Sequence, residues 1–464
     1  MSASPVGETV HRRLARLVHA VRYDDLGPDA VRAVKQVVLD SLGCVFGGFA
    51  SAPAAATRAI ADRLGGRPEA SIFGTGIKTS MPLAAFANGT ALRYLDFNDV
   101  FSGRRDASHP SGNLPGALAV AEAEGRSGRD LIAAIVAAYE VQSRLCDNAG
   151  VPNLKKRGWH HTCNLQFSSA AAAARLLSDD PEVTANALAI SGTHQNTLAQ
   201  IQHGRIATIK ATADGWIAKA AVEAALLALE GVGGPDEIFE GTAGWGKVVA
   251  GGADFEAMLA PVQGFRIVQV RFKPFAAVGP AAAPIQAAVD LHATGKVPID
   301  RIRRVEIQMP GDIVDDPAVD EAKRYPANRE TADNSFYYCV AMGLMEGDVG
   351  EAQYAPEKLT SPRVRALLST MTMVADPEFT SGRPEISGGG VRVTLDDGSV
   401  HERRHPVQPG HPRNPLTDDQ LAAKFHRQLE PLVPSARIDA IQRAVMGLED
   451  CADVAEFAAL LRKP

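Results

Sequence analysis

The stretch from residue 94 to 115, YLDFNDVFSGRRDASHPSGNLP, gathers acidic, basic and imidazole side chains among glycines and prolines. Carboxylates and histidine are the side chains most often used to move protons near neutral pH. Two interpretations fit the loop. In one, Asp96 and Asp99 cap backbone amides in a turn and His109 is an ordinary surface histidine. In the other, the loop lines a cleft and its side chains take part in chemistry.

A second group of histidines lies in RGWHHTCNLQ (157–166), where His160 and His161 precede an alanine-rich segment. Adjacent side chains in a regular helix or strand point apart, so at most one of the two is expected to face a site. His109, His160 and His161 form no His-x-x-x-His pair and have no carboxylate at a ligand spacing, and the five cysteines include no Cys-x-x-Cys pair. We therefore expect no metal.

Two lysines stand beside loop signals. Lys210 lies in QHGRIATIKATADG (202–215), and Lys273 lies in VRFKPFAAVGPAAAP (270–284), at the end of an expected strand. Each lysine alone is typical of a solvated surface charge.

Composition limits the function classes. The formal net charge of -6 comes with basic and acidic residues that alternate along the chain, which argues against nucleic-acid binding. The longest uncharged apolar stretch, LIAAIVAAY (131–139), is too short to span a bilayer, and no signal-peptide pattern opens the chain. We expect a cytoplasmic protein without a membrane partner.

Helical periodicity covers most of residues 10 to 260. In residues 29–46 the apolar side chains recur at steps of three and four and form one stripe: Val31, Val34, Val38, Leu42 and Val45. Segments 115–145, 165–178 and 213–230 are rich in alanine on several sides, as expected for helices packed against neighbours all round. No repeat of fixed period is evident.

Near residue 265 the apolar period changes from 3.6 to 2. We expect strands at 265–272 and 303–309, a hairpin at 391–404 around Asp397-Gly398, helices at 280–293 and 331–346, and a final helix from Thr417. The expected fold is mainly α. Residues 1–265 and 406–464 form a large helical domain from both chain ends, and residues 266–405 form an inserted, smaller α+β lid domain.

Eight segments resemble the MmgE/PrpD family, which includes 2-methylcitrate dehydratase, cis-aconitate decarboxylase and iminodisuccinate epimerase. They are VLDSLGCVFGG (38–48), LDFNDV (95–100), HPSGNLP (109–115), GWHHT (158–162), IKATADGWIAKAA (209–221), FKPF (272–275), TADNSFYYCVAMGLMEGD (331–348) and the stretch 410–417. The resemblance spans nearly the whole chain. It implies the two-part fold above, a homodimer, and activity without a metal or organic cofactor.

Carried across position by position, the resemblance also implies site residues. The active-site aspartate falls on Asp96, the catalytic histidine on His109, a second histidine on His160, two anion-binding lysines on Lys210 and Lys273, and a tyrosine on Tyr338. The neighbours His161 and Tyr337 are set aside.

These residue types suit the family's small anionic di- or tricarboxylate substrates. Removing a proton from carbon beside a carboxylate is difficult unless fixed cations meet the developing charge, which Lys210 and Lys273 can supply. His109 is the expected proton carrier, with Asp96 orienting it or raising its pKa. Asp99 is expected to order the loop or contact the substrate, and Arg104 or Arg105 to clamp a carboxylate.

The expected activity is that of a hydro-lyase, a carbon–oxygen lyase acting on 2-methylcitrate, citrate or a similar hydroxy acid, with His160 or Tyr338 protonating the leaving hydroxyl. The alternatives are a cis-aconitate-type decarboxylase, an iminodisuccinate-type epimerase, and a catalytically silent helical binding protein. Two features differ from the family: Val100 replaces a common threonine, and the segment 272–284 is unusually apolar.

Overall fold

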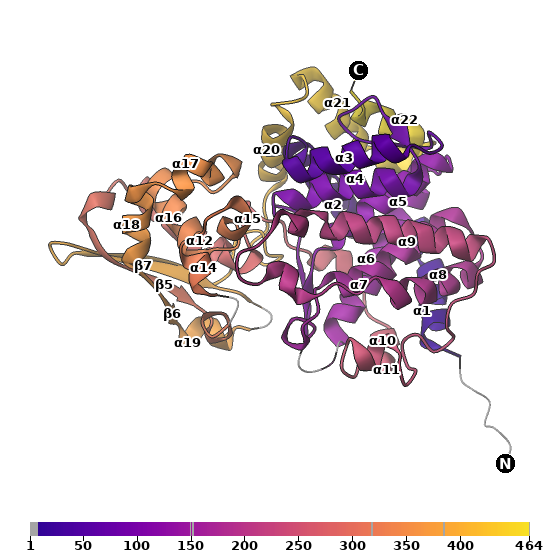
Figure 1. Ribbon diagram of the computed structural model, residues 1–464, viewed down its shortest axis with the longest axis horizontal. Coiled ribbons are helices and arrows are strands. Elements are labelled where there is room, and N and C mark those ends of the chain that lie inside the picture. Colours follow the sequence, from indigo (N-terminus) through magenta and orange to yellow (C-terminus); the bar gives the residue numbers. More distant parts are fainter. Residues whose placement is uncertain (1–7, 149, 151–152, 317–318, 384–385, 464) are drawn as a thin grey trace, which may run out of the picture.

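The computed structural model describes residues 8–148, 150, 153–316, 319–383 and 386–463. Figure 1 shows two lobes: a large helical lobe, and a smaller α+β lobe that contains a sheet. The helices of the C-terminal end lie with those of the N-terminal half, so both ends of the chain build the helical lobe. The fold class is therefore as expected, mainly α with an inserted α+β part.

The helical lobe comprises α1 (Val10–Ala20), α2 (Pro28–Gly48), α3 (Ala52–Leu64), α4 (Met81–Tyr94), α5 (Leu114–Ala123), α6 (Gly128–Asn148), α7 (Thr162–Leu177), α8 (Pro181–His194), α9 (Ala213–Leu229), α10 (Trp245–Val248), α11 (Phe255–Leu259), α20 (Asp418–Leu429), α21 (Ser435–Met446) and α22 (Val454–Leu461). It also holds two short ribbons, β1 (Ala70–Ser71) with β2 (Lys78–Thr79) and β3 (Phe101–Ser102) with β4 (Ala107–Ser108).

The α+β lobe comprises α12 (Ala282–Ala293), β5 (Ile302–Met309), α13 (Gly311–Val314), α14 (Glu321–Arg324), α15 (Arg329–Ala332), α16 (Phe336–Glu346), α17 (Pro356–Leu359), α18 (Pro362–Ser369), β6 (Met371–Ala375), α19 (Pro377–Ser381), β7 (Gly389–Leu395) and β8 (Val400–His405). Among these described residues the sheet order is β6-β5-β7-β8, with β5 parallel to β6 and the remaining pairs antiparallel.

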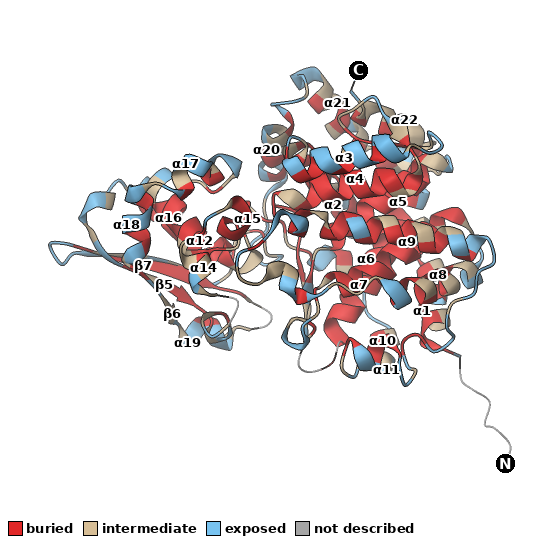
Figure 2. Ribbon diagram, in the orientation of Figure 1, coloured by how far each residue is buried: buried red, intermediate tan, exposed pale blue. Residues whose placement is uncertain are grey.

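Alanine and glycine let the central helices approach closely. Helices α4, α5, α6, α7 and α9 are buried along most of their length (Figure 2). Where α4 crosses α9, a methyl group on Gly89 would lie 2.6 Å from the Cα of Gly215, so neither position has room for a side chain. This contact fixes the end of α4 against the start of α9, the two places from which the site residues Arg93 and Asp214 come.

Most expected elements are confirmed. Helix α2 begins at Pro28 and buries Val34, Val38 and Leu42. Strands β5, β7 and β8 form as expected, with Gly398 at a φ of 84° in the turn. Helix α20 begins after Thr417, whose hydroxyl accepts from the Gln420 amide in a capping box.

Four details differ. The expected helix 331–346 is divided: α15 ends at Ala332 and α16 begins at Phe336. The segment 265–272 is not a strand: it contains a 3-10 turn at Arg266–Gln269 and one isolated bridge at Arg271. The buried residues there are Ile267, Val270 and Phe272, and the three-residue step from Ile267 to Val270 suits a 3-10 turn better than a strand. The helical segment 115–145 divides into α5 and α6 at Gly125, where φ is 57°. Strand β6 was not expected.

Within the described residues, no single helix is long and apolar enough to cross a membrane, although α2 and α3 together, bent by 90° at their junction, meet the length and composition required.

Candidate functional site

The site is built around the carboxylate of Asp96, just past the end of α4. Its φ of 50° makes it the one residue other than glycine, among those described, with a positive φ. Such a backbone costs free energy and persists where the surroundings enforce it. Here the enforcement is electrostatic: Asp96 lies 3.0 Å from Arg93 Nη1, 2.9 Å from Lys210 Nζ and 2.5 Å from Lys273 Nζ.

These groups come from distant parts of the chain. Arg93 ends α4, Lys210 lies in the 3-10 turn Thr208–Thr212 before α9, and Lys273 follows the isolated bridge at Arg271. Each of the three cations is at most 4% exposed. Lys273 also donates to the Asp96 carbonyl at 2.8 Å, which holds the loop in its unusual conformation.

A second carboxylate, Asp333, ties the cluster to the α+β lobe. It lies between α15 and α16 and accepts from Lys210 Nζ at 2.9 Å and from Arg329 Nη1 at 2.8 Å. Helix α20 contributes Lys424, whose ammonium donates to the backbone carbonyls of Phe97 and Lys273. Segments from the N-terminal half, the inserted part and the C-terminal end therefore meet at one place.

The cations keep Asp96 ionised. Burial opposes its charge, but Arg93, Lys210 and Lys273 outweigh that effect and hold the pKa of Asp96 well below its usual range. Burial lowers the pKa of Lys273, and Asp96 partly offsets the loss. In this structure Asp96 is thus the anion that compensates a buried group of positive charges.

Three imidazoles lie beside the cluster. The ring centroids of His109 and His161 are 5.0 Å apart, and those of His161 and His160 are 3.9 Å apart. Burial, and then the charge of Arg93, lowers the pKa of His160 to about 3, and burial takes the pKa of His109 well below its usual range. The rings are therefore neutral at pH 7 and can accept a proton.

His109 has a defined orientation. Its Nδ1 lies 2.6 Å from the carbonyl oxygen of Asp99. Because a carbonyl only accepts, Nδ1 carries the proton and Nε2 holds the lone pair. The expected partner was the Asp96 carboxylate. The structure instead gives that role to the Asp99 backbone, and Asp96 raises the pKa of His109 only against the larger effect of burial.

His161 lies inside this group, although the sequence argument set it aside. The two rings come together because His160 and His161 precede α7 in a turn, so the alternation of a regular helix or strand does not apply. His160 Nδ1 contacts the Thr162 hydroxyl at 3.0 Å. Both ring nitrogens of His161 lack a hydrogen-bond partner among the described residues.

Asp99 supports the loop from behind. Its Oδ1 accepts from the Ser111 amide at 3.0 Å, and its Oδ2 accepts from the Tyr139 hydroxyl at 2.8 Å. Burial raises the pKa of Asp99 to about 6. With both oxygens occupied inside the protein, Asp99 orders the loop, and the expectation that its carboxylate contacts a substrate is not supported.

The remaining expected residues lie elsewhere. Arg104 and Arg105 are exposed, and the Arg104 guanidinium turns to Asn148 at 3.4 Å, at the end of α6. Neither contacts the Asp96 cluster. Tyr338 in α16 is fully buried, and its hydroxyl donates to the Gln353 carbonyl at 2.6 Å. Burial also raises its pKa above the usual range, so the geometry does not favour it as a proton donor.

Sequence reasoning missed Arg93, Asp214 and Asp333. Asp214, at the start of α9, lies 3.7 Å from Arg93 Nε, and neither of its oxygens has a hydrogen-bond partner among the described residues. Burial raises the pKa of Asp214 to about 6, against the pull of Arg93. The signal for Arg93 was its spacing, since a residue three positions before Asp96 at a helix end can reach back to it.

No group of three or more His, Cys, Asp or Glu side chains in the described part of the chain is arranged to hold a metal ion. The arrangement that is present joins neutral imidazoles to a cluster of buried cations. Such a site can bind an organic anion and remove a proton from carbon beside its carboxylate.

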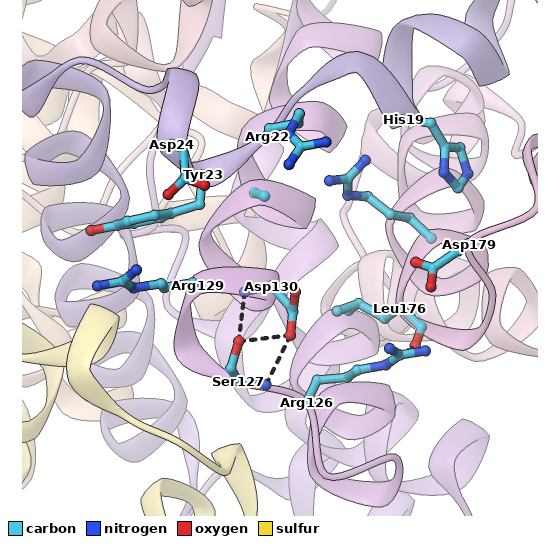
Figure 3. A pocket seen from close by; sticks show the side chains of 12 residues that line it. His19, Arg22, Tyr23, Asp24, Arg126, Ser127, Arg129, Asp130, Leu176 and Asp179 are labelled. Carbon is cyan, nitrogen blue, oxygen red and sulfur yellow. Dashed lines mark hydrogen bonds between the residues drawn. The ribbon is translucent and has the colours of Figure 1, made fainter.

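A cavity of about 550 Å³ lies away from this cluster and is lined by other residues (Figure 3). Its arginines mainly complete helix ends: Arg175 donates to the Val18 and Val21 carbonyls, and Arg126 donates to the Leu176 carbonyl at 2.6 Å. Aspartates also line it. The arginines of this cavity are therefore explained by their contacts with helix ends, and we assign the cavity no ligand.

Comparison with known proteins adds independent information. A family model described as the MmgE/PrpD N-terminal domain matches residues 12–258, and the model of the MmgE/PrpD C-terminal domain matches residues 275–450. Cis-aconitate decarboxylase of Homo sapiens is 28% identical, over 98% of this chain and 95% of that protein. Two proteins named 2-methylcitrate dehydratase are similar as well. That of Yarrowia lipolytica is 28% identical over 96% of this chain and 88% of its own length, and that of Cupriavidus necator is 26% identical over 94% and 95%.

Proposed function

The chain belongs to the MmgE/PrpD family, and from that premise we propose that it is a lyase acting on a small polycarboxylate, with His109 as the base. The observation that carries the proposal is the neutral imidazole of His109 beside a buried cluster of Arg93, Lys210 and Lys273. The names of the relatives support the substrate class.

The two lysines have hydrogen-bonding capacity to spare. Each ammonium has three N–H groups. Lys210 uses two of them, on Asp96 and Asp333, and Lys273 uses two, on the carboxylate and carbonyl of Asp96. One donor on each lysine is therefore available to a substrate carboxylate, where it would stabilise the charge that develops when the neighbouring carbon loses a proton.

We favour dehydration of a hydroxy-polycarboxylate such as 2-methylcitrate or citrate. His109 Nε2 takes the proton from the carbon beside the carboxylate, the C–H electrons form the double bond, and the C–O bond breaks. The departing hydroxide takes the proton back from the imidazolium and leaves as water, so His109 ends neutral. This sequence needs neither Tyr338 nor His160 as an acid.

A decarboxylase of the cis-aconitate type is the second candidate, because a relative with that name aligns over 98% of this chain. There the carbon–carbon bond to a carboxylate breaks, carbon dioxide leaves, and the carbanion takes a proton from His109. This route requires His109 to be protonated from solvent beforehand, which its lowered pKa disfavours at pH 7. An epimerase would need a second acid on the opposite face of the carbon, and His161, whose ring centroid lies 5.0 Å from that of His109, is a candidate.

The test offers the purified protein 2-methylcitrate, citrate, cis-aconitate and iminodisuccinate. New unsaturation is followed by ultraviolet absorbance and products by mass. The proposal expects loss of water from a hydroxy acid by the wild type and by a His194→Ala control, whose histidine is exposed on α8, but not by His109→Ala. Release of carbon dioxide from cis-aconitate would select the second candidate. No turnover of any of the four acids would refute the lyase proposal.

A further inference from the structure

Arg271 is a cation of the site region that neither the sequence argument nor the proposed mechanism uses. Its backbone pairs with Val100, in the loop that carries Asp96 and His109. The Arg271 amide donates to the Val100 carbonyl at 2.8 Å, and the Val100 amide donates to the Arg271 carbonyl at 2.9 Å. Residues directly opposite each other in an antiparallel pair project to the same face. The Arg271 side chain therefore lies on the face of Val100.

That face is also the face of Lys273. A methyl group placed on Gly279 would lie 3.6 Å from Val100 Cγ2 and 4.0 Å from Lys273 Cε, so these two side chains converge on the same small residue. Arg271 precedes Lys273 by two positions, the spacing at which side chains of an extended segment share a side. Val100 thus shares a face with Arg271 and with the lysine that binds Asp96.

The guanidinium of Arg271 has no protein anion. It forms no hydrogen bond or ion pair with any residue that the structure describes, in contrast to Arg93 and Arg329, which are both paired with aspartates. Burial lowers its pKa to about 10, and the charge of another cation, Arg383, lowers it further. Arg271 is partly buried. A partly buried guanidinium without a counter-ion is unfavourable, and its planar set of donors matches a carboxylate in a two-point contact.

We propose that Arg271 binds a carboxylate of the substrate that Lys210 and Lys273 do not hold, so that the site selects acids with a further carboxylate. This inference rests on the proposed function. Arg104 or Arg105 was expected to bind a substrate carboxylate, but both are exposed. The proposal assigns that role to Arg271 instead. Val100, between the two charged groups, then packs against the carbon chain that joins the carboxylates.

The test measures binding by titration calorimetry with two unreactive probes, tricarballylate with three carboxylates and glutarate with two. Arg271→Gln should weaken tricarballylate binding about tenfold to a hundredfold, as expected for loss of a charged hydrogen bond, and should change glutarate binding much less. Arg271→Lys should bind tricarballylate with intermediate affinity. The control Arg363→Gln removes an exposed guanidinium paired with Asp300 and should bind as wild type does.

Thermal melting of each variant checks that it is folded, and Arg271→Lys carries the test if Arg271→Gln is not. Equal tricarballylate affinity in the folded variants and the wild type would refute the role of Arg271 and leave the lyase proposal intact. A wild-type protein that binds neither probe would overturn the polycarboxylate site, and with it this inference.

Discussion

Replacing Asp96 by asparagine removes the negative charge at the centre of the cluster and little else. Asparagine has nearly the same shape and tolerates a positive φ better than most residues, so the backbone at 50° can be kept. What changes is that Lys273 loses its carboxylate partner, while Arg93 keeps Asp214 at 3.7 Å and Lys210 keeps Asp333 at 2.9 Å.

The expected cost follows from burial. Asp96 is 3% exposed, so solvent cannot replace the lost charge. Removing one partner from a buried ion pair costs about 3–5 kcal/mol of unfolding free energy. Because the cations hold the pKa of Asp96 well below its usual range, this contribution is fully present above the unfolded-state pKa of about 3.9 and is lost only as the pH falls through the folded-state value. The penalty should therefore be constant from pH 5 to 8.

The assay is unfolding by guanidinium chloride and by heat, monitored by circular dichroism, with Asp300→Asn as the control. Asp300 pairs with Arg363 at the surface, where loss of the ion pair should have little effect. Added tricarballylate should raise the melting temperature of Asp96→Asn more than that of the wild type, because the anion then supplies the missing charge. If Asp96→Asn and Asp300→Asn unfold at the same midpoint, the cations do not depend on Asp96 and the electrostatic account of the site is wrong.

Three further outcomes follow from the same geometry. His109→Ala should lower kcat at least about a hundredfold with little change in melting temperature. Wild-type kcat/KM should stay level as the pH falls from 7 to 6 because the pKa of His109 is lowered, and a decline of kcat/KM near pH 6.5 on the acidic side would count against His109. Lys273→Ala should raise KM more than it lowers kcat. Steady-state kinetics, with Lys219→Ala as a surface control, measure both constants, and an unchanged KM in Lys273→Ala would contradict the role of Lys273. Asp214 has a pKa raised to about 6 by burial, so its charge destabilises the fold progressively from about pH 4 to 6; the melting temperature of Asp214→Asn minus that of the wild type should rise over that range, and a flat difference would refute the assignment.

Much of the fold could be predicted because it depends on patterns that lie close together in the sequence. The stripe of α2, the helix start at Thr417 and the Asp397-Gly398 hairpin are all local signals, and all three were confirmed. Strand β6 was missed because its partner β5 lies more than sixty residues earlier, and parallel pairing has no turn signal.

The site was predictable to the extent that its residues stand in recognisable motifs. Asp96, Lys210 and Lys273 meet as the resemblance implied, and His109 lies beside them. The errors concern the directions in which side chains of the loop point. Nothing in the loop sequence tells that Asp99 faces inward to Tyr139 or that Arg104 turns to Asn148, since both outcomes depend on the position of α6. The unpartnered state of Arg271 likewise depends on tertiary packing.

The pairing of Lys210 with both Asp96 and Asp333 has a mechanical consequence, because the two carboxylates belong to different lobes. Any ligand that binds the Lys210 ammonium competes with these two ion pairs, which connect the helical lobe to the α+β lobe. By thermodynamic reciprocity, a change that separates the two lobes must alter the free energy of ligand binding by the same amount by which the ligand alters the association of the lobes.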